Sequence, residues 1–189
     1  MSKSRSVMYL LSRSFMLVAI AALCLCRAEL QAAIVMQVSG ITGDSRIEGK
    51  KDWIDLYSYQ QGMATSVTLG TGTGGPVVSK PVHSDITLSK NLDRSSVPIA
   101  LKLNTGTKFA TVVIEFLTSG STPKTYYRIT LSDAYFTSLS TSSGGDQPVE
   151  SVSIFYSKIM WEYFPNDPSG VPGTTPVKGE WNVLTGTGK

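Results

Sequence analysis

The residue types that most enzymes use for acid–base or nucleophilic chemistry are scarce in this sequence. There is one histidine, His83, and the two cysteines, Cys24 and Cys26, both lie in an apolar run near the N-terminus. A Ser-His-Asp triad would have to use His83, but no G-x-S-x-G turn is present to expose a serine. A zinc site would have to join His83 to carboxylates alone, which is not a usual ligand set. We therefore predict no enzyme activity, no metal, no cofactor and a structural role for His83.

Two further segments match known sequence motifs, but neither has the structural surroundings that its motif requires. "GTGTGG" (70–75) satisfies G-x-G-x-x-G, yet Pro76 follows it, and no helix N-terminus is predicted there to hold a pyrophosphate. Asp52 and Asp55 flank Trp53 as carboxylates flank an aromatic ring in some carbohydrate sites. Two lysines stand directly before this group, so a solvated strand end is the simpler interpretation.

The distribution of charge argues against nucleic acid as a partner. The chain has 17 basic and 14 acidic side chains, and after residue 33 it has 13 of each. A protein that binds phosphates needs a basic patch or stripe, which this neutral remainder lacks. The excess positive charge lies in the first 33 residues, in Lys3, Arg5, Arg13 and Arg27 against Glu29.

The N-terminal residues have the pattern of a secretory signal peptide. Basic residues precede an apolar run of 12 residues (15–26), which is too short for a membrane span of about 20 residues. Small residues follow, and we expect cleavage after Ala32, with Ala28 as a second choice. The alternative is a buried N-terminal helix. Cleavage would give an exported protein without a stable membrane anchor and without cysteine, hence without disulfides.

The rest of the chain predicts a mainly β domain over 33–164, followed by a Pro/Gly-rich tail over 165–189. Many strands at short spacing with one helix are typical of a β-barrel or sandwich. Ser96 is a candidate helix cap, and the tail has one candidate anchor, Trp181. We expect strands at 33–40, 52–64, 85–92, 109–118, 124–140 and 149–164, a short helix at about 97–104, and a flexible loop at 68–81.

The predicted strand 52–64 has aromatic residues on the face that should meet solvent. Alternation places Ile54 and Leu56 on one face and Trp53, Tyr57 and Tyr59 on the other. Apolar surface beyond what one domain can cover points to subunit contacts, so we predict assembly. The alternative is a monomeric exported domain that binds a ligand, such as a surface glycan, through these three aromatic residues.

Several blocks of the sequence, in order from about 34 to 185, resemble the haemolysin-coregulated protein (Hcp) family of type VI secretion systems. The first is "SGITGDSRIEGKKDWIDLYSYQQGM", and the second is "HSDITLSKNLDRSSVPIALKLNTGTKFATVVIEF". The third is "VESVSIFYSKIMWEYFP", and the tail segment "PVKGEWNVLTGTGK" is similar to a G-G-W-D-[LV] tail of many members. The family-motif positions are Gly43, Asp52, Trp53, Ile54, Tyr59, His83, Lys90, Asp93, Tyr156, Lys158 and Trp161.

The resemblance implies a compact two-sheet antiparallel β-barrel with one short helix at its side. It further implies a non-catalytic subunit of hexameric rings that stack into a tube, with room for small effector cargo in the lumen. A signal peptide is a departure from the family, whose tube subunits assemble in the cytoplasm. We expect export to the periplasm or beyond. The alternative is a cytoplasmic protein that is secreted by the type VI machinery.

Overall fold

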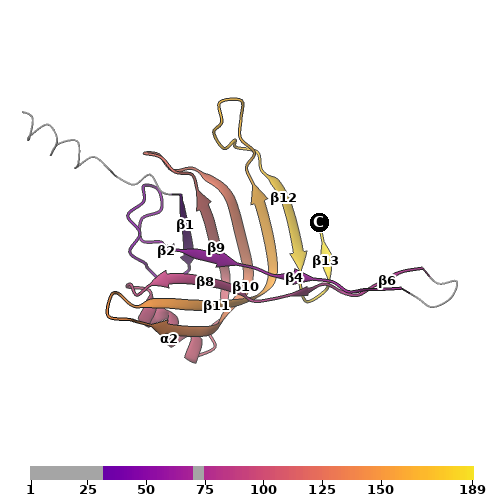
Figure 1. Cartoon of the computed structure of the whole chain (residues 1–189), viewed down its shortest axis with the longest axis horizontal. Helices are drawn as coiled ribbons and strands as arrows, with labels where there is room; N and C mark the ends of the chain where they lie inside the picture. Colours follow the sequence, from indigo (N-terminus) through magenta and orange to yellow (C-terminus); the bar gives the residue numbers. More distant parts are fainter. Residues whose placement is uncertain (1–31, 70–74) are drawn as a thin grey trace, which may run out of the picture. The chain divides into compact units, whose positions relative to one another are not determined.

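The computed structural model describes residues 32–69 and 75–189 of the chain. These residues form mainly antiparallel β-strands with one helix, α2 (Ser96–Asn104), which confirms the predicted fold class (Figure 1). The strands are β1 (Ala33–Val38), β2 (Ile54–Leu56), β3 (Ser58–Gln60), β4 (Met63–Ala64), β5 (Val67–Thr68), β6 (Val77–Val78), β7 (Val82–His83), β8 (Ile86–Asn91), β9 (Phe109–Leu117), β10 (Thr125–Ser142), β11 (Val149–Tyr163), β12 (Val177–Asn182) and β13 (Thr187–Gly188).

The longest strands connect two curved sheets around one core. The main order is β13-β12-β11-β10-β9-β1-β2, and β8 branches from β11 with β3 beyond it. The first half of β11 pairs with β8, in register Ile154↔Ile86, and its second half pairs with β12, in register Ile159↔Trp181. Near the point where β11 changes partner, Asp133 of β10 has a positive φ of 50°, and the register of β10 with β11 then shifts at a bulge between Phe136 and Ser138.

The segment 54–60 crosses from one sheet to the other, so the prediction of one continuous strand over 52–64 is wrong. β2 pairs with β1, the Tyr57 N–H then donates to the Ser89 carbonyl at 2.8 Å, and β3 pairs with β8. The break changes which side chains face inward. Ile54 is buried, Tyr57 is exposed, and Tyr59 packs edge-on against Phe116 at 5.3 Å between ring centroids.

The core lies between the two sheets and is almost entirely aliphatic. Alternate strand positions supply it, because successive side chains of a strand point to opposite faces. Helix α2 contributes Ile99, which is fully buried, while Val97 and Leu101 of the same helix remain exposed. The largest fully buried apolar side chains are Met36, Ile54, Ile86, Leu88, Ile99, Ile114, Leu117, Ile129, Leu131, Ile154 and Ile159.

The helix forms where the sequence predicts it, but Ser96 is not its cap. The N-cap is Ser95, which makes no capping hydrogen bond through its side chain, and Ser96 is the first helical residue. The Ser96 hydroxyl donates instead to a carboxylate oxygen of Glu150 at 2.6 Å. Gly106, with φ +59°, follows the C-cap Thr105 as expected for a helix end.

The predicted loop at 68–81 is also wrong in part, because this region is a paired β-ribbon. β4 pairs with β7 in register Met63↔His83, and β5 pairs with β6 in register Val67↔Val78. We call residues 63–69 and 75–83 the arm. Its strands leave the main sheet and run outward from it (Figure 1).

Strands also form in the region predicted as a tail, where β12 and β13 extend the main sheet past β11. At the start of the described residues, Ala32 is exposed and directly precedes β1. The rest of the predicted signal peptide lies outside the described residues. No helix within residues 32–69 and 75–189 has the length and apolar character needed to cross a membrane.

Candidate functional site: the arm and the aromatic pocket at its base

The arm exposes aliphatic side chains on both of its strands. Val67 and Val78 face each other across the ribbon and are 59% and 62% exposed, and Leu69 is 78% exposed. A two-stranded ribbon is at best marginally stable in water by itself, and exposed apolar clusters mark contact sites. The arm is therefore the part of the described chain that most needs a partner surface. Its exposed large apolar residues are Met63, Val67, Leu69, Val77, Val78 and Val82.

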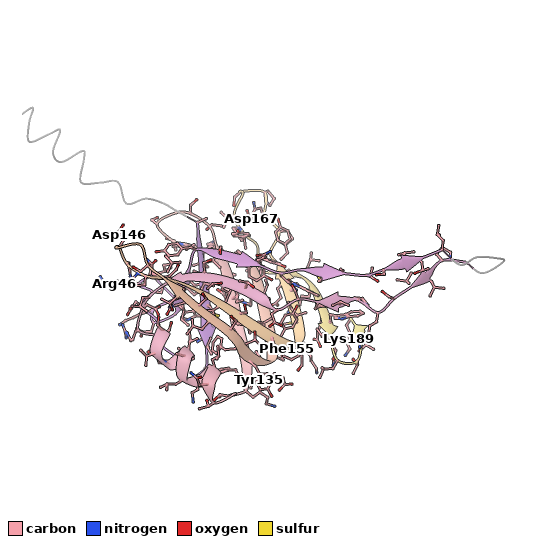
Figure 2. The ribbon with its side chains drawn as sticks, turned by 60° about the horizontal axis from the view of Figure 1, so that its bottom comes forward. Arg46, Tyr135, Asp146, Phe155, Asp167 and Lys189 are labelled. Atoms are coloured by element: carbon pink, nitrogen blue, oxygen red, sulfur yellow. The ribbon has the colours of Figure 1, made fainter. Side chains whose placement is uncertain are left out.

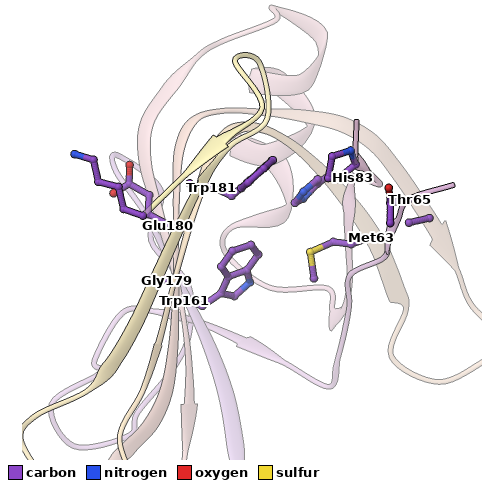
Figure 3. Close-up of a pocket in the computed structure, with 11 residues that line it drawn as sticks. Met63, Thr65, His83, Trp161, Gly179, Glu180 and Trp181 are labelled. Carbon is purple, nitrogen blue, oxygen red and sulfur yellow. The ribbon is translucent and has the colours of Figure 1, made fainter. Parts of the chain in front are cut away.

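A pocket of 570 Å³ lies where the arm leaves the sheet (Figure 3). Met63 and His83 line it from the arm, and Trp161 and Trp181 line it from β11 and β12. The His83 ring is nearly parallel to the Trp181 indole, with centroids 6.3 Å apart and planes 9° apart. We call this site the aromatic pocket.

A glycine lies opposite each of the two tryptophans, and at Gly188 it makes the space that the indole ring needs. Trp161 pairs with Gly179 across β11 and β12, and Trp181 pairs with Gly188 across β12 and β13. A Cβ on Gly188 would lie 2.6 Å from an indole carbon of Trp181, so no larger residue fits without displacing the ring. The glycines of the predicted tail thus position the walls of the pocket.

Behind the aromatic walls, Gln61 forms hydrogen bonds with three ring side chains, and one of these contacts His83 in turn. Its Oε1 accepts from the Tyr59 hydroxyl at 2.7 Å and from Trp161 Nε1 at 3.2 Å. Its Nε2 donates to the Tyr156 hydroxyl at 3.1 Å, which in turn lies 3.2 Å from His83 Nδ1. Burial raises the pKa of both tyrosines and lowers the pKa of His83, so all three are neutral at pH 7.

His83, for which the sequence predicts a structural role, makes one side-chain hydrogen bond within the described residues. Its hydrogen-bond partner is the Tyr156 phenol and not a serine, so the contact has no nucleophile of the Ser-His-Asp type. In residues 32–69 and 75–189, no three His, Asp or Glu side chains are grouped to hold a metal ion.

Two of the family-motif residues, Lys90 and Asp93, belong to a buried ion cluster at the start of α2. Lys90 is fully buried, and its Nζ lies 2.8 Å from Asp93 and 2.8 Å from Glu150. The same Nζ donates to the Ser96 hydroxyl at 2.9 Å and to the Asn91 carbonyl at 2.7 Å. The cluster ties β8, β11 and the first turn of α2 together.

Three others, Gly43, Asp52 and Trp53, shape the loop between β1 and β2. A Cβ on Gly43 would lie 2.3 Å from the Trp53 carbonyl oxygen, and Asp52 adopts a positive φ of 65°. Lys50 lies over the Trp53 ring, with Nζ 4.4 Å from its centroid. Asp52 is a turn residue here, paired loosely with Arg94 at 3.8 Å, and not one of two facing carboxylates.

The remaining motif residues lie apart from these groups, since Ile54 is a core residue and Lys158 of β11 is exposed. The three aromatic residues considered for ligand binding, Trp53, Tyr57 and Tyr59, do not form a common surface. Tyr57 is exposed and accepts from Asn91, Trp53 is half-buried under Lys50, and Tyr59 turns inward.

A ladder of charges that the sequence motifs do not predict crosses the outer face of the main sheet. Glu115, Arg128, Glu162 and Lys178 are direct neighbours on β9, β10, β11 and β12. Arg128 lies 2.8 Å from Glu115 and 3.4 Å from Glu162, Lys178 lies 2.9 Å from Glu162, and Lys50 pairs with Glu115. A charged residue inside an otherwise apolar strand, as in "VVIEFL", is the signal that could have indicated it.

Comparison with known proteins places this arrangement in one family. The family model described as "Type VI secretion system effector, Hcp" matches residues 35–163. No curated protein sequence matches the chain.

Solved structures with the same fold include one titled "Structure of a type six secretion system protein", with TM-score 0.77 and 25% identity over 84% of this chain and 100% of that one. Hcp1 from Salmonella typhimurium has TM-score 0.68 and 18% identity, over 84% of this chain and 99% of its own. The secreted protein Hcp3 from Pseudomonas aeruginosa has TM-score 0.59 and 18% identity, over 80% and 98%. The chain belongs to the Hcp family of type VI secretion proteins.

Proposed function

We propose that the protein is a non-catalytic structural subunit that assembles into hexameric rings, like the tube subunit of type VI secretion. The observation that carries this proposal is the arm. Its exposed valines and leucine have no covering partner within the described chain, and burying about 100 Å² of apolar surface would stabilise a contact by roughly 2.5 kcal/mol. A second copy supplies both the required surface and the symmetry of a closed ring.

The proposal extends to stacking of the rings and to small effector cargo or other secretion components as partners. We further propose that the chain is exported after cleavage behind Ala32. The first strand begins at Ala33 and the family match at residue 35, so cleavage there would leave the folded sheet intact. Secretion from the cytoplasm by the type VI machinery is the alternative route.

Native mass spectrometry of the purified protein at micromolar concentration tests the assembly. We expect a hexamer, with ring-shaped particles by negative-stain electron microscopy. A protein that stays monomeric up to about 100 µM would refute the proposal, since subunit contacts of this kind bury enough surface for tighter association. N-terminal sequencing of the native protein tests the cleavage, and an N-terminus at Ala33 is expected.

A further inference from the structure

We propose that the aromatic pocket binds a small, neutral, flat aromatic molecule that carries one hydrogen-bond acceptor, such as a carbonyl oxygen. This goes beyond ring assembly, because it assigns a ligand class to a site in a single copy of the chain. The pocket volume of 570 Å³ lies in the range of about 300–1,000 Å³ that small-molecule sites occupy.

The walls of the pocket select for a flat ring. The His83 ring is nearly parallel to the Trp181 indole, at 9° and 6.3 Å between centroids, and is inclined by 28° to the Trp161 indole, at 6.5 Å. These separations are near the outer end of the range of about 4.5–7 Å for aromatic pairs, so the rings contact one another only weakly. No further ring fits between His83 and either indole, so a flat ligand would lie against the indole faces that line the cavity, where the Met63 thioether is a favourable neighbour for an aromatic edge.

The charges around the pocket favour a neutral ligand over a cation. A cation site in an aromatic cage gains from a nearby carboxylate, but the Glu180 side chain points away from the cavity (Figure 3). The other charged side chain in the lining is that of Lys189, which is a cation and not a carboxylate. His83 is uncharged, because burial lowers its pKa.

The hydrogen-bond network gives His83 a free donor. The buried Tyr156 hydroxyl accepts from Gln61 and must itself donate, and within the described chain its other partner is His83 Nδ1. His83 Nδ1 is then the acceptor, and the proton of the neutral ring lies on Nε2. No side chain in the described residues accepts from Nε2, and the ring projects from the arm toward Trp181 (Figure 3). A ligand carbonyl in the cavity beside His83 can accept this proton.

The pocket can be tested with three probes that separate flatness from hydrogen bonding. Acetophenone has both properties, ethylbenzene lacks the oxygen, and cyclohexyl methyl ketone keeps the oxygen but is not flat. Each is titrated into protein with ¹⁵N-labelled tryptophan, and the indole N–H signals are followed. We expect acetophenone to shift the signals of Trp161 and Trp181 and to bind several-fold more tightly than either other probe. Trp53 lies outside the pocket lining and serves as an internal control.

Two variants assign the contacts. His83→Phe keeps a flat wall and removes the donor, so acetophenone should bind roughly 2- to 10-fold more weakly while ethylbenzene is unaffected. Trp181→Ala removes a wall and should weaken both aromatic probes about 10-fold or more. Phe155→Ala is the matched control. It removes an aromatic residue that contacts Tyr135 (Figure 2) and does not line the pocket, so it should change neither affinity.

Thermal melting of each variant shows whether it is folded. The proposal is overturned if acetophenone at millimolar concentration moves none of the indole signals. Equal affinity for acetophenone and ethylbenzene, or an equal shift of Trp53, would overturn it as well. Because the readout is ligand binding, a protein that fails to form rings can still bind acetophenone, and the two proposals fail separately.

Discussion

Lys90 in the sheet and Val67 on the arm are both unusual for their residue types, in opposite directions. Lys90 is a charged side chain with no exposure, and its ammonium group has acceptors on every side, including two carboxylates. Val67 is an aliphatic side chain that is 59% exposed, on a ribbon two strands wide. The sheet therefore satisfies even a buried charge within one chain, whereas the arm leaves apolar surface open. The contrast supports the proposal that a second copy of the chain covers the arm.

The strongest test of this contrast is to remove the arm. Replacing residues 65–80 with a short Gly-rich turn should abolish assembly, because the exposed aliphatic surface is lost, while the sheet stays folded. Native mass spectrometry measures the first effect, and circular dichroism with thermal melting measures the second. A truncated protein that still forms hexamers would show that the arm is dispensable for the ring.

Removal of the buried charge should instead destabilise the sheet itself. Lys90→Met leaves Glu150 and Asp93 without their cation, and such a change destabilises by about 3–5 kcal/mol. Urea unfolding of the monomeric, arm-deleted protein gives the free energy directly. The double variant Lys90→Met/Glu150→Gln should recover part of the loss. No recovery would mean that the lysine acts through packing and not through its charge.

A smaller effect on assembly is expected from a conservative change on the arm. Val67→Thr and Val78→Thr keep the β-branched shape and strand propensity but replace a methyl group with a hydroxyl on each strand. Stability should change by less than about 0.5 kcal/mol, as for most surface substitutions. The dissociation of the ring should shift to several-fold higher concentration, measured by analytical ultracentrifugation. The matched control, Val97→Thr on the exposed face of α2, should leave the dissociation unchanged.

The pH dependence of stability tests the ladder of charges on the main sheet. Burial alone would raise the pKa of Glu115, but hydrogen bonds from Lys50, Thr125 and Arg128 lower it overall. A lowered pKa in the folded state contributes stability that is complete above the unfolded value, and this stability decreases as the pH falls through the folded value. Unfolding in urea between pH 6 and pH 3 should show this loss. Glu115→Gln should remove its share of the pH dependence, and an unchanged slope would contradict it.

The smallest effect is expected at the exposed end of the same ladder. The Lys178 side chain is 57% exposed and pairs with Glu162 at 2.9 Å, so Lys178→Ala should change stability by at most about 1 kcal/mol. The effect should decrease further in 0.5 M salt, because salt screens exposed pairs. A larger loss that salt does not reduce would mean that the lysine stem packs against the sheet.

The elements with strong patterns could be predicted from the sequence. The apolar runs at 109–118 and 149–164 agree closely with β9 and β11, and the helix near 97–104 agrees with α2. In these segments local preference and burial favour the same structure. The ordered motif blocks also predicted the family correctly.

The arm and the aromatic pocket could not be predicted, because they depend on contacts between segments that are distant in the sequence. The strands of the arm are only two residues long, and residue types typical of loops, such as Ser66, Pro76 and Ser79, flank them. Gly179 and Gly188 suggested a tail, but each faces a tryptophan on the neighbouring strand. Tyr57 shows no local signal for a break, because the change of partner from β1 to β8 is decided by the whole sheet. Gln61 likewise gains its role only in the folded chain, where its side chain forms hydrogen bonds with Tyr59, Tyr156 and Trp161.

The pairing of β1 bears on the order in which the chain can fold. β1 is the first strand of the sheet, but its longest partner is β9, with Ala33 opposite Leu117. The sheet cannot close until more than half of the chain has been synthesised, and such distant pairings make folding slow. The long β10–β11 hairpin is joined by a short turn and can form earlier. Slow closure of the sheet would favour the proposed export, because a translocation channel that accepts only unfolded polypeptides requires a chain that has not yet folded.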